Sequence, residues 1–286
     1  MSTDTLPYQN VLVIAATGKT GRRVVPLLER RGVTVRRGSR SGSPAFDWAE
    51  PATWGPALEG MDAAYVVYTP DLAVPGAEED LTRFVEVAKS KGVRKLVLLS
   101  GRGEPEARAC ELIVERSGLV WTIVRAGWFD QNFSEGDFAG MVADGVIALP
   151  NPDVREPFVD VDDIAEVAAG ALLDPRHNGE VYEVTGPELL TYADVAQQLS
   201  EAAGREIRYA PVTTEEFFAG MAQAGVPAEY GDLLRYLFEI TRSGVNAHVT
   251  DGVQRALGRP PRSFRAFAAR AAAKGAFAEI GQGSRG

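Results

Sequence analysis

VLVIAATGKTGRR, residues 11–23, is the stretch of sequence that decides the fold of this protein. Its apolar run at 11–14 predicts a buried strand, small residues follow at 15–21, and from Val24 the apolar side chains recur with helical spacing. A strand, a glycine turn and a helix form a phosphate cradle, because the backbone can approach a pyrophosphate and the helix N-terminus offers free N–H groups. The stretch therefore predicts a dinucleotide site; the alternative is an ordinary strand-to-helix turn without a ligand.

The glycine spacing of this turn departs from the usual pattern at one position. It reads G-x-x-G-x-x-G with Ala15 in place of the first glycine, followed by Gly18 and Gly21. Alanine is expected to be tolerated there if its φ is negative, since it adds only a methyl group. Residues 18–20, GKT, are similar to the end of a P-loop, but that motif needs a glycine where the chain has Val13, so a P-loop is excluded.

Composition limits the possible partners. The 286 residues carry a net charge of −9, which argues against general affinity for nucleic acid or an anionic membrane. The longest apolar runs are too short to cross a bilayer, and the polar N-terminus does not look like a secretory signal. A single cysteine, Cys110, and two histidines predict neither a disulfide nor a zinc site. We therefore expect a cytoplasmic protein, a monomer or homodimer, with no metal, nucleic-acid or membrane partner.

Strand and helix patterns alternate through the first two-thirds of the chain, which predicts an α/β fold with a Rossmann-type, doubly wound parallel sheet. The expected strands are 11–14, 33–35, 46–48, 63–68, 95–99, 120–124, 156–159 and 180–184. Beyond Pro187 the alternation stops, and helices are expected near 192–203, 214–224, 228–242, 246–257 and 263–273. We expect a dinucleotide-binding domain at 1–186, a smaller, mostly helical substrate lobe at 187–274, and a disordered tail at 275–286.

The end of the second expected strand indicates which dinucleotide is bound. Residues 36–40 read RRGSR, where an NAD-preferring site would place Asp or Glu for the ribose 2′-hydroxyl. Arginine suits a 2′-phosphate, because a guanidinium group matches phosphate as a bidentate fork. The pattern favours NADP(H) over NAD(H), with Arg40 as the first candidate contact and Arg37 as the second. The alternative is that both arginines are merely solvated.

Several motifs together resemble a known family. They are the TG-x-x-G turn, Ser100 after the fifth expected strand, SGLVWTIVR at 117–125, WFDQNFS at 128–134 and DVDDIA at 160–165. Over about residues 10–270 the chain resembles the NmrA-like, atypical short-chain dehydrogenase/reductases, in the branch that includes the ergot-alkaloid dehydrogenases. The resemblance implies that the pyrophosphate is held by Ala16, Thr17, Gly18, Lys19 and Thr20, and that Asp47 and Trp48 lie beside the adenine. It also implies that Thr69 and Pro70 border the nicotinamide ribose and that Ser100 and Gly101 lie near the nicotinamide.

One departure from the ordinary dehydrogenases concerns proton transfer. Those enzymes use a Tyr-x-x-x-Lys pair, whereas residues 101–117, GRGEPEARACELIVERS, contain neither Tyr nor Lys. A ketone under reduction needs a proton donor, but an iminium carbon is neutralised by hydride alone and a hydroquinone anion can be protonated by water. The sequence therefore favours an activated acceptor: an iminium or imine, a quinone or a related π-system.

Some residues remain as candidates for the chemistry. Ser100 could donate a hydrogen bond to a bound oxygen or simply satisfy local backbone, and Arg102 could stabilise an anion or lie in a solvated loop. Glu104 is expected at the surface, Glu111 and Glu115 on one solvated or Arg108-paired helix face, and His177 in an exposed turn. Five residues could line an aromatic-friendly substrate pocket, with core packing as the alternative: Trp128, Phe129, Gln131, Asn132 and Tyr230.

The sequence thus supports an NADPH-dependent oxidoreductase of specialised metabolism that acts on a small aromatic or polycyclic molecule. Two alternatives stay open: a non-enzymatic NADP(H)-binding redox sensor of the NmrA type, and a non-redox isomerase or cyclase that retains the cofactor.

Overall fold

The computed structural model describes residues 6–136 and 138–277. Their contacts divide the chain into two compact units, and neither is continuous in sequence. The first takes in the residues up to 126, then 161–184 and 251–260; the second takes in 127–160, 185–250 and the residues from 261 onward. The structure therefore divides the chain differently from a single boundary at residue 186. The expected tail at 275–286 lies mostly outside the described residues.

The first unit is built on a six-stranded sheet in the order β2-β1-β3-β4-β5-β7, with every neighbouring pair parallel. The strands are β1 (Asn10–Ile14), β2 (Thr34–Gly38), β3 (Ala63–Val66), β4 (Lys95–Gly101), β5 (Val120–Ala126) and β7 (Glu180–Val184). From β1 the chain adds β2 on one side and β3 on the other, so a topological switch point lies at β1, where open α/β sheets bind ligands beyond the strands' carboxyl ends. This topology confirms the predicted Rossmann-type fold.

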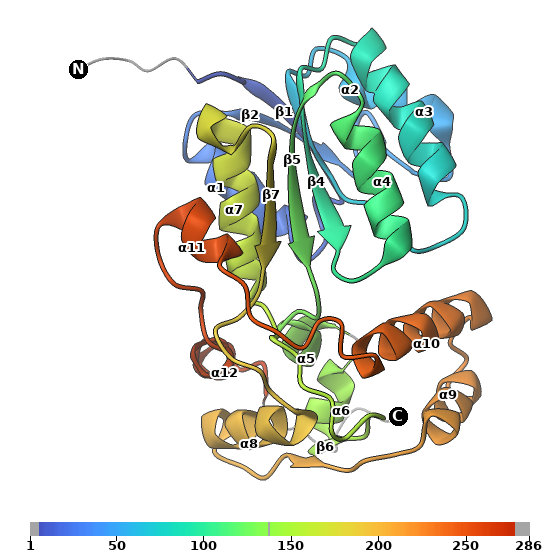
Figure 1. Ribbon diagram of the computed structural model, residues 1–286, viewed down its shortest axis with the longest axis vertical. Helices are drawn as coiled ribbons and strands as arrows, with labels where there is room; N and C mark the ends of the chain where they lie inside the picture. The colour runs from blue at the N-terminus through green and yellow to red at the C-terminus, as the bar shows by residue number, and fades with distance from the viewer. Residues whose placement is uncertain (1–5, 137, 278–286) are drawn as a thin grey trace. The chain divides into compact units, whose positions relative to one another are not determined.

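Helices cover both faces of this sheet (Figure 1). One face carries η1 (Pro51–Thr53), α2 (Trp54–Leu58), α3 (Ala77–Ser90) and α4 (Pro105–Glu115); the other carries α1 (Gly21–Glu29) and α7 (Val161–Leu173). The short η2 (Pro175–His177) follows α7, and α11 (Gly252–Leu257) packs against α7 and β7. Strand residues such as Leu12, Val66 and Leu98 are fully or almost fully buried, which explains their near-continuous apolar runs.

Two expected strands are not formed. At 46–48 the chain is irregular, and Trp48 packs among Phe46, Trp54, Tyr68 and Phe84 while its Nε1 donates to the Val67 carbonyl at 2.9 Å. Phe46 and Trp48 alternate along the chain as strand residues do, but they are buried by this aromatic packing and not by pairing in a sheet. Residues 156–159 make only isolated bridges, Glu156 with Leu190 and Val159 with Phe129.

The second unit is mostly helical. Its helices are α5 (Asn132–Glu135), α6 (Ala139–Ala143), α8 (Tyr192–Ala203), α9 (Thr214–Gln223), α10 (Ala228–Arg242) and α12 (Phe264–Ala273), with a small parallel pair of β6 (Val146–Ile147) and β8 (Arg208–Tyr209). Capping boxes at Thr191 and Thr213 fix the starts of α8 and α9. The core of this unit contains many phenylalanines, among them Phe133. None of the helices at 6–136 and 138–277 is long and apolar enough to cross a membrane.

Candidate functional site

The turn between β1 and α1 has the tight geometry of a phosphate cradle. Ala15 adopts a φ of 52°, so the expectation of a negative φ at this position is wrong, and the alanine occupies the left-handed conformation that glycine would adopt freely. The Gly18 N–H closes the turn on the Ala15 carbonyl at 2.8 Å. A Cβ on Gly21 would lie 2.2 Å from that same carbonyl oxygen, so Gly21 permits a contact that no other residue could make.

The cradle also presents unused donors. In the part of the chain that the structure describes, the backbone N–H groups of Thr17, Thr20 and Gly21 donate to no backbone acceptor outside α1, and Thr20 is the N-cap of α1 without a side-chain cap. N–H groups at a helix N-terminus favour an anion, and the macrodipole of the nine-residue α1 adds to this preference. The residues present therefore fit a dinucleotide pyrophosphate, with Ala16 to Thr20 as the group that would hold it.

The two candidate arginines differ in their surroundings. Arg37 is exposed and donates to Glu29 Oε1 at 2.9 Å, so its charge is already partnered. Arg40 is exposed, and no ion pair or side-chain hydrogen bond links it to another described residue. Arg37 lies near the end of β2 and Arg40 just beyond it, and residues 36–40 contain no carboxylate. Arg40 is thus the better placed of the two to receive a phosphate.

The other predicted cofactor residues lie at the strands' carboxyl ends or beside them. Exposed Thr69 and Pro70 follow β3, whereas Ser100 and Gly101 end β4. Asp47 is half-buried, and its Oδ1 accepts from the Ala49 N–H. Trp48 is buried in the aromatic cluster described above. The positions of Thr69, Pro70, Ser100 and Gly101 are where ligands of such sheets bind, and all their contacts to a cofactor stay predictions.

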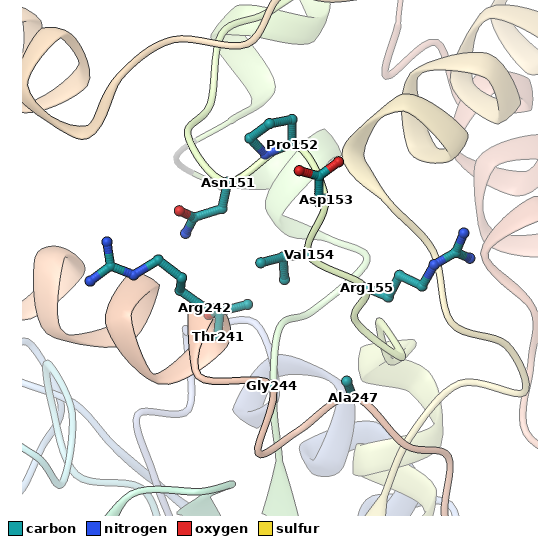
Figure 2. A pocket seen from close by; sticks show the side chains of 9 residues that line it. All are labelled: Asn151, Pro152, Asp153, Val154, Arg155, Thr241, Arg242, Gly244 and Ala247. Carbon is teal, nitrogen blue, oxygen red and sulfur yellow. The ribbon is translucent and has the colours of Figure 1, made fainter.

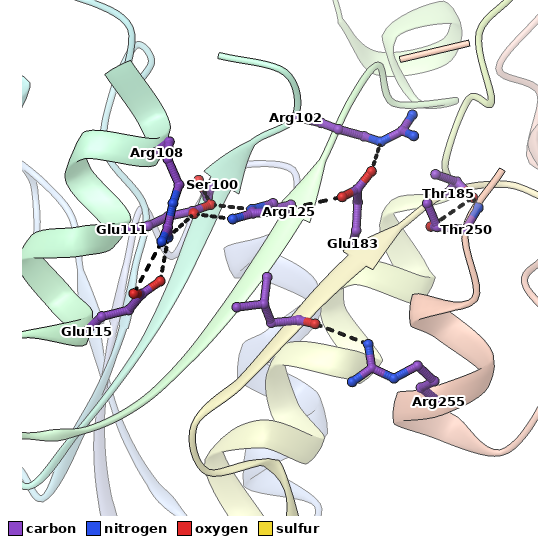
Figure 3. A network of polar contacts seen from close by, with 11 residues as sticks. Ser100, Arg102, Arg108, Glu111, Glu115, Arg125, Glu183, Thr185, Thr250 and Arg255 are labelled. Carbon is purple, nitrogen blue, oxygen red and sulfur yellow. Dashed lines mark hydrogen bonds and ion pairs between the residues drawn. The ribbon is translucent and has the colours of Figure 1, made fainter. Parts of the chain in front are cut away.

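Ser100 is tied to a buried ionic network (Figure 3). Its Oγ donates to Glu111 Oε1 at 2.7 Å, and Arg125 donates to both oxygens of Glu111 at 2.7 and 2.6 Å. Arg108 donates to Glu111 at 2.9 Å and also to Glu115. Burial raises the pKa of Glu111, but the hydrogen bonds from Arg125, Ser100 and Arg108 outweigh burial and lower it. The expected pairing with Arg108 is therefore present, but Glu111 is buried and not on a solvated face.

Arg102 is also engaged. Its side chain is only 2% exposed, and its Nε donates to Glu183 Oε1 at 2.6 Å (Figure 3). A solvated loop position is therefore wrong for Arg102. The charge of Arg102 is balanced by the carboxylate of Glu183 in β7, and this ion pair anchors the loop after β4. A substrate anion would have to compete with Glu183 for Arg102.

Glu104 differs most from its expected place. It is 9% exposed rather than at the surface, and its carboxyl is hydrogen-bonded to the carboxyl of Asp71. The Glu104 carboxyl fills the space beside Gly101, where a Cβ would lie 2.0 Å from Oε2. Sequence reasoning missed Asp71 altogether; its position directly after the Thr69-Pro70 segment is the signal that could have found it.

The residues predicted for a substrate pocket have mixed surroundings within the second unit. Trp128 stacks on Phe138 and Phe238, and its Nε1 donates to Thr241 Oγ1 at 3.1 Å. Gln131 is buried and donates to Asp160 Oδ1 at 2.8 Å, which differs from a pocket-lining role. Phe129, Asn132 and Tyr230 are half-buried, and Tyr230 packs against the core of this unit.

A pocket of about 500 Å³ lies in the second unit, between the loop 151–155 and the C-terminal end of α10 with the turn that follows (Figure 2). None of the five predicted pocket residues lines it, but Thr241, which accepts from Trp128, does. The guanidinium groups of Arg155 and Arg242 point to opposite sides, so they do not form a joint anion site. The lining residues are Asn151, Pro152, Asp153, Val154, Arg155, Thr241, Arg242, Gly244 and Ala247.

The sheet topology and the cradle define a dinucleotide-binding protein of the Rossmann class. Comparison with family models agrees: residues 15–175 match a model described as NAD(P)H-binding, and residues 108–256 match that of the NmrA-like family. The chain belongs to the NmrA-like family, a family of NAD(P)H-binding oxidoreductases, which confirms the resemblance drawn from its motifs.

Similar proteins are named as reductases and dehydrogenases. The chain is 34% identical to an NAD(P)H azoreductase of Xenophilus azovorans, over 93% of this chain and 99% of the relative. It is 31% identical to agroclavine dehydrogenase of Claviceps fusiformis, over 90% and 95%. An NADPH-dependent quinone oxidoreductase of Escherichia coli, solved with NADPH, shares the fold with a TM-score of 0.75 at 20% identity, over 91% of this chain and 99% of that one.

Proposed function

We propose that this protein is an NADPH-dependent reductase that transfers hydride to an activated, small organic acceptor with an aromatic or polycyclic body. When bound, the reduced dinucleotide supplies the hydride. The acceptor classes are an iminium or imine, a quinone and a related π-system. The azoreductase, agroclavine dehydrogenase and quinone oxidoreductase named above support this range, because each is a relative or a fold neighbour.

The observation that carries the proposal is that the usual Tyr–Lys pair is missing after β4 and that the polar side chains there are already engaged. Ordinary dehydrogenases activate a tyrosine with a lysine, but residues 101–117 contain neither. The hydroxyl proton of Ser100 is directed at Glu111, and Arg102 is paired with Glu183. Neither Ser100 nor Arg102 is therefore placed to protonate an alkoxide directly, whereas an activated acceptor needs less assistance.

The preference for NADPH rests on the end of β2. Arg40 is exposed, and no ion pair or side-chain hydrogen bond with another described residue competes with a phosphate, while the RRGSR segment offers no carboxylate to a ribose 2′-hydroxyl. A guanidinium–phosphate pair would add a charge-assisted hydrogen bond that NADH cannot make.

The test is a stopped-flow measurement of NADPH absorbance with a panel of iminium, imine, quinone and azo acceptors, alongside calorimetric titration of NADPH, NADP⁺ and NADH. We expect turnover with at least one class and tighter binding of NADPH than of NADH. Tight NADPH binding with no turnover across the panel would refute the reductase and favour a redox sensor. Equal binding of NADPH and NADH would refute the role of Arg40.

A further inference from the structure

Two carboxyl groups meet at the carboxyl edge of the first unit's sheet, and the function proposed above does not use them. Asp71 follows β3 and Glu104 follows β4, and these two strands are neighbours. The Glu104 carboxyl is buried and hydrogen-bonded to that of Asp71, and no N–H or hydroxyl of the described residues donates to Glu104 Oε2. Two carboxylates cannot hydrogen-bond to each other without a proton, so the contact requires one between them.

The surroundings keep that proton in place. Burial, followed by the charge of Asp71, raises the pKa of Glu104 to about 9, and burial raises the pKa of Asp71. The other charged groups that act on Glu104 are Glu106 and Glu111, both acidic, and the charge of Asp71 also acts on the buried Cys110 thiol of α4. Asp71 Oδ1 accepts from the Ala73 N–H at 2.9 Å, which favours Asp71 as the ionised member. The pair therefore holds one proton and one negative charge at neutral pH.

The pair lies against the segment predicted to border the nicotinamide. Because Gly101 has no side chain, the Glu104 carboxyl packs against its backbone, and a Cβ there would lie 2.0 Å from Oε2. Asp71 directly follows Thr69 and Pro70, the residues predicted for the nicotinamide ribose, and it is half-buried where Glu104 is buried. Asp71 is thus the outer member of the pair and Glu104 the inner one.

We propose that the Asp71–Glu104 pair is the proton source of this site, and that the acceptors it serves are neutral azo, quinone or imine groups, which take up a proton with the hydride. This inference rests on the proposed function. Hydride adds to one atom of the acceptor double bond, and the π electrons move to the other atom. Glu104 passes the pair's proton to Asp71, Asp71 delivers it to that second atom, and solvent then returns one proton to the pair. An iminium acceptor, already cationic, needs no such proton.

The first test uses the protein without cofactor or substrate. Infrared difference spectra at pH 7 between the unchanged protein and E104Q should show the C=O stretch of a protonated carboxyl that E104Q lacks; the exposed control E86Q should keep it. The amide of E104Q can still donate to Asp71, so folding is expected to survive. Stability provides a second readout: a raised pKa of Glu104 means that stability falls as pH rises from about 5 to about 9, and E104Q should remove this slope. An unchanged band and an unchanged slope would overturn the protonated pair.

The second test measures turnover. With a quinone or azo acceptor, D71N and E104Q should lower kcat by about 100-fold or more, with KM for NADPH unchanged and the pH profile altered. With an iminium acceptor the same variants should keep kcat within about threefold. Quinone turnover that is equal in all variants would overturn the proton role but leave the reductase standing. If no acceptor is turned over by the unchanged protein, the reductase and the proton role both fail, while the infrared band still decides whether the pair is protonated.

Discussion

Replacing Glu111 with alanine is expected to destabilise the first unit strongly. The carboxylate is 1% exposed and accepts four hydrogen bonds: from Ser100 at 2.7 Å, from Arg125 at 2.7 and 2.6 Å, and from Arg108 at 2.9 Å. Without it, the partly buried Arg125 keeps, among the described residues, only Glu183 as an ion-pair partner, at 3.9 Å. Breaking a buried pair by removing one partner costs about 3–5 kcal/mol. Because Arg125 retains some exposure and a distant partner, we expect about 3 kcal/mol.

Urea unfolding, followed by tryptophan fluorescence and far-UV circular dichroism, measures this cost, and two probes are needed because two units need not unfold together. E115Q is the matched control: it removes the other partner of Arg108 on the same helix, at a more exposed position, and should cost less than about 1 kcal/mol. Equal effects of E111A and E115Q would refute the reasoning.

Unfolding at acidic pH checks the sign of the contribution that Glu111 makes to stability. The pKa of Glu111 is lowered in the folded protein, so its contribution to stability is present above the pKa of an unfolded glutamate, about 4.3, and is lost as pH falls through the lower folded value. The difference in stability between the unchanged protein and E111Q should therefore shrink below about pH 4. A difference that grows on acidification would contradict the assigned ion pairs.

Three further predictions concern other parts of the first unit. G21A should abolish binding of NADPH and lower the unfolding free energy by several kcal/mol, since its Cβ would lie 2.2 Å from the Ala15 carbonyl oxygen. G140A is the control, because its Cβ would meet nothing within 4 Å, and it should be neutral or stabilising in the same unfolding and calorimetry measurements. R40Q should raise the calorimetric Kd for NADPH about tenfold and leave the Kd for NADH nearly unchanged. R37Q should change neither Kd much, because Arg37 already pairs with Glu29. An equal loss of affinity for both dinucleotides in R40Q would refute a phosphate contact. Burial lowers the pKa of Lys95 to about 8, below the unfolded value of about 10.4, so stability should rise as pH increases from about 8 to about 10, and urea titrations of K95M should lack this rise.

The sheet and most of its helices could be predicted because each leaves a strong periodic pattern. Helix α3 (Ala77–Ser90) is an example: Leu81, Phe84 and Val85 recur in the sequence with helical spacing and are buried on one face. The strand expected at 46–48 shows the limit of such patterns: Phe46 and Trp48 are spaced like strand residues, but their rings pack into a cluster that draws on Trp54 and Phe84. Periodicity records that a side chain is buried and does not record what it is buried against.

Charged residues at the candidate site could not be placed from the sequence, because their partners are far away along the chain. Arg102, which follows β4, pairs with Glu183 of β7 on the far side of β5, and Glu104 pairs with Asp71, which follows the neighbouring strand β3. His177, expected in an exposed turn, is 1% exposed, and its Nδ1 lies 2.7 Å from the Tyr182 hydroxyl. Local polarity suggested solvent in each case. The strand order, which sets these pairings, is a property of the whole sheet.

The interleaving of the two units has a consequence for synthesis and for evolution. The chain leaves one unit for the other after residues 126, 160, 184, 250 and 260. On the ribosome, β5 therefore emerges well before β7, its sheet neighbour, and α11 emerges only after most of the second unit. The first unit therefore cannot complete its fold during synthesis until most of the second unit has also been made. For the same reason, a single recombination crossover cannot exchange either unit intact.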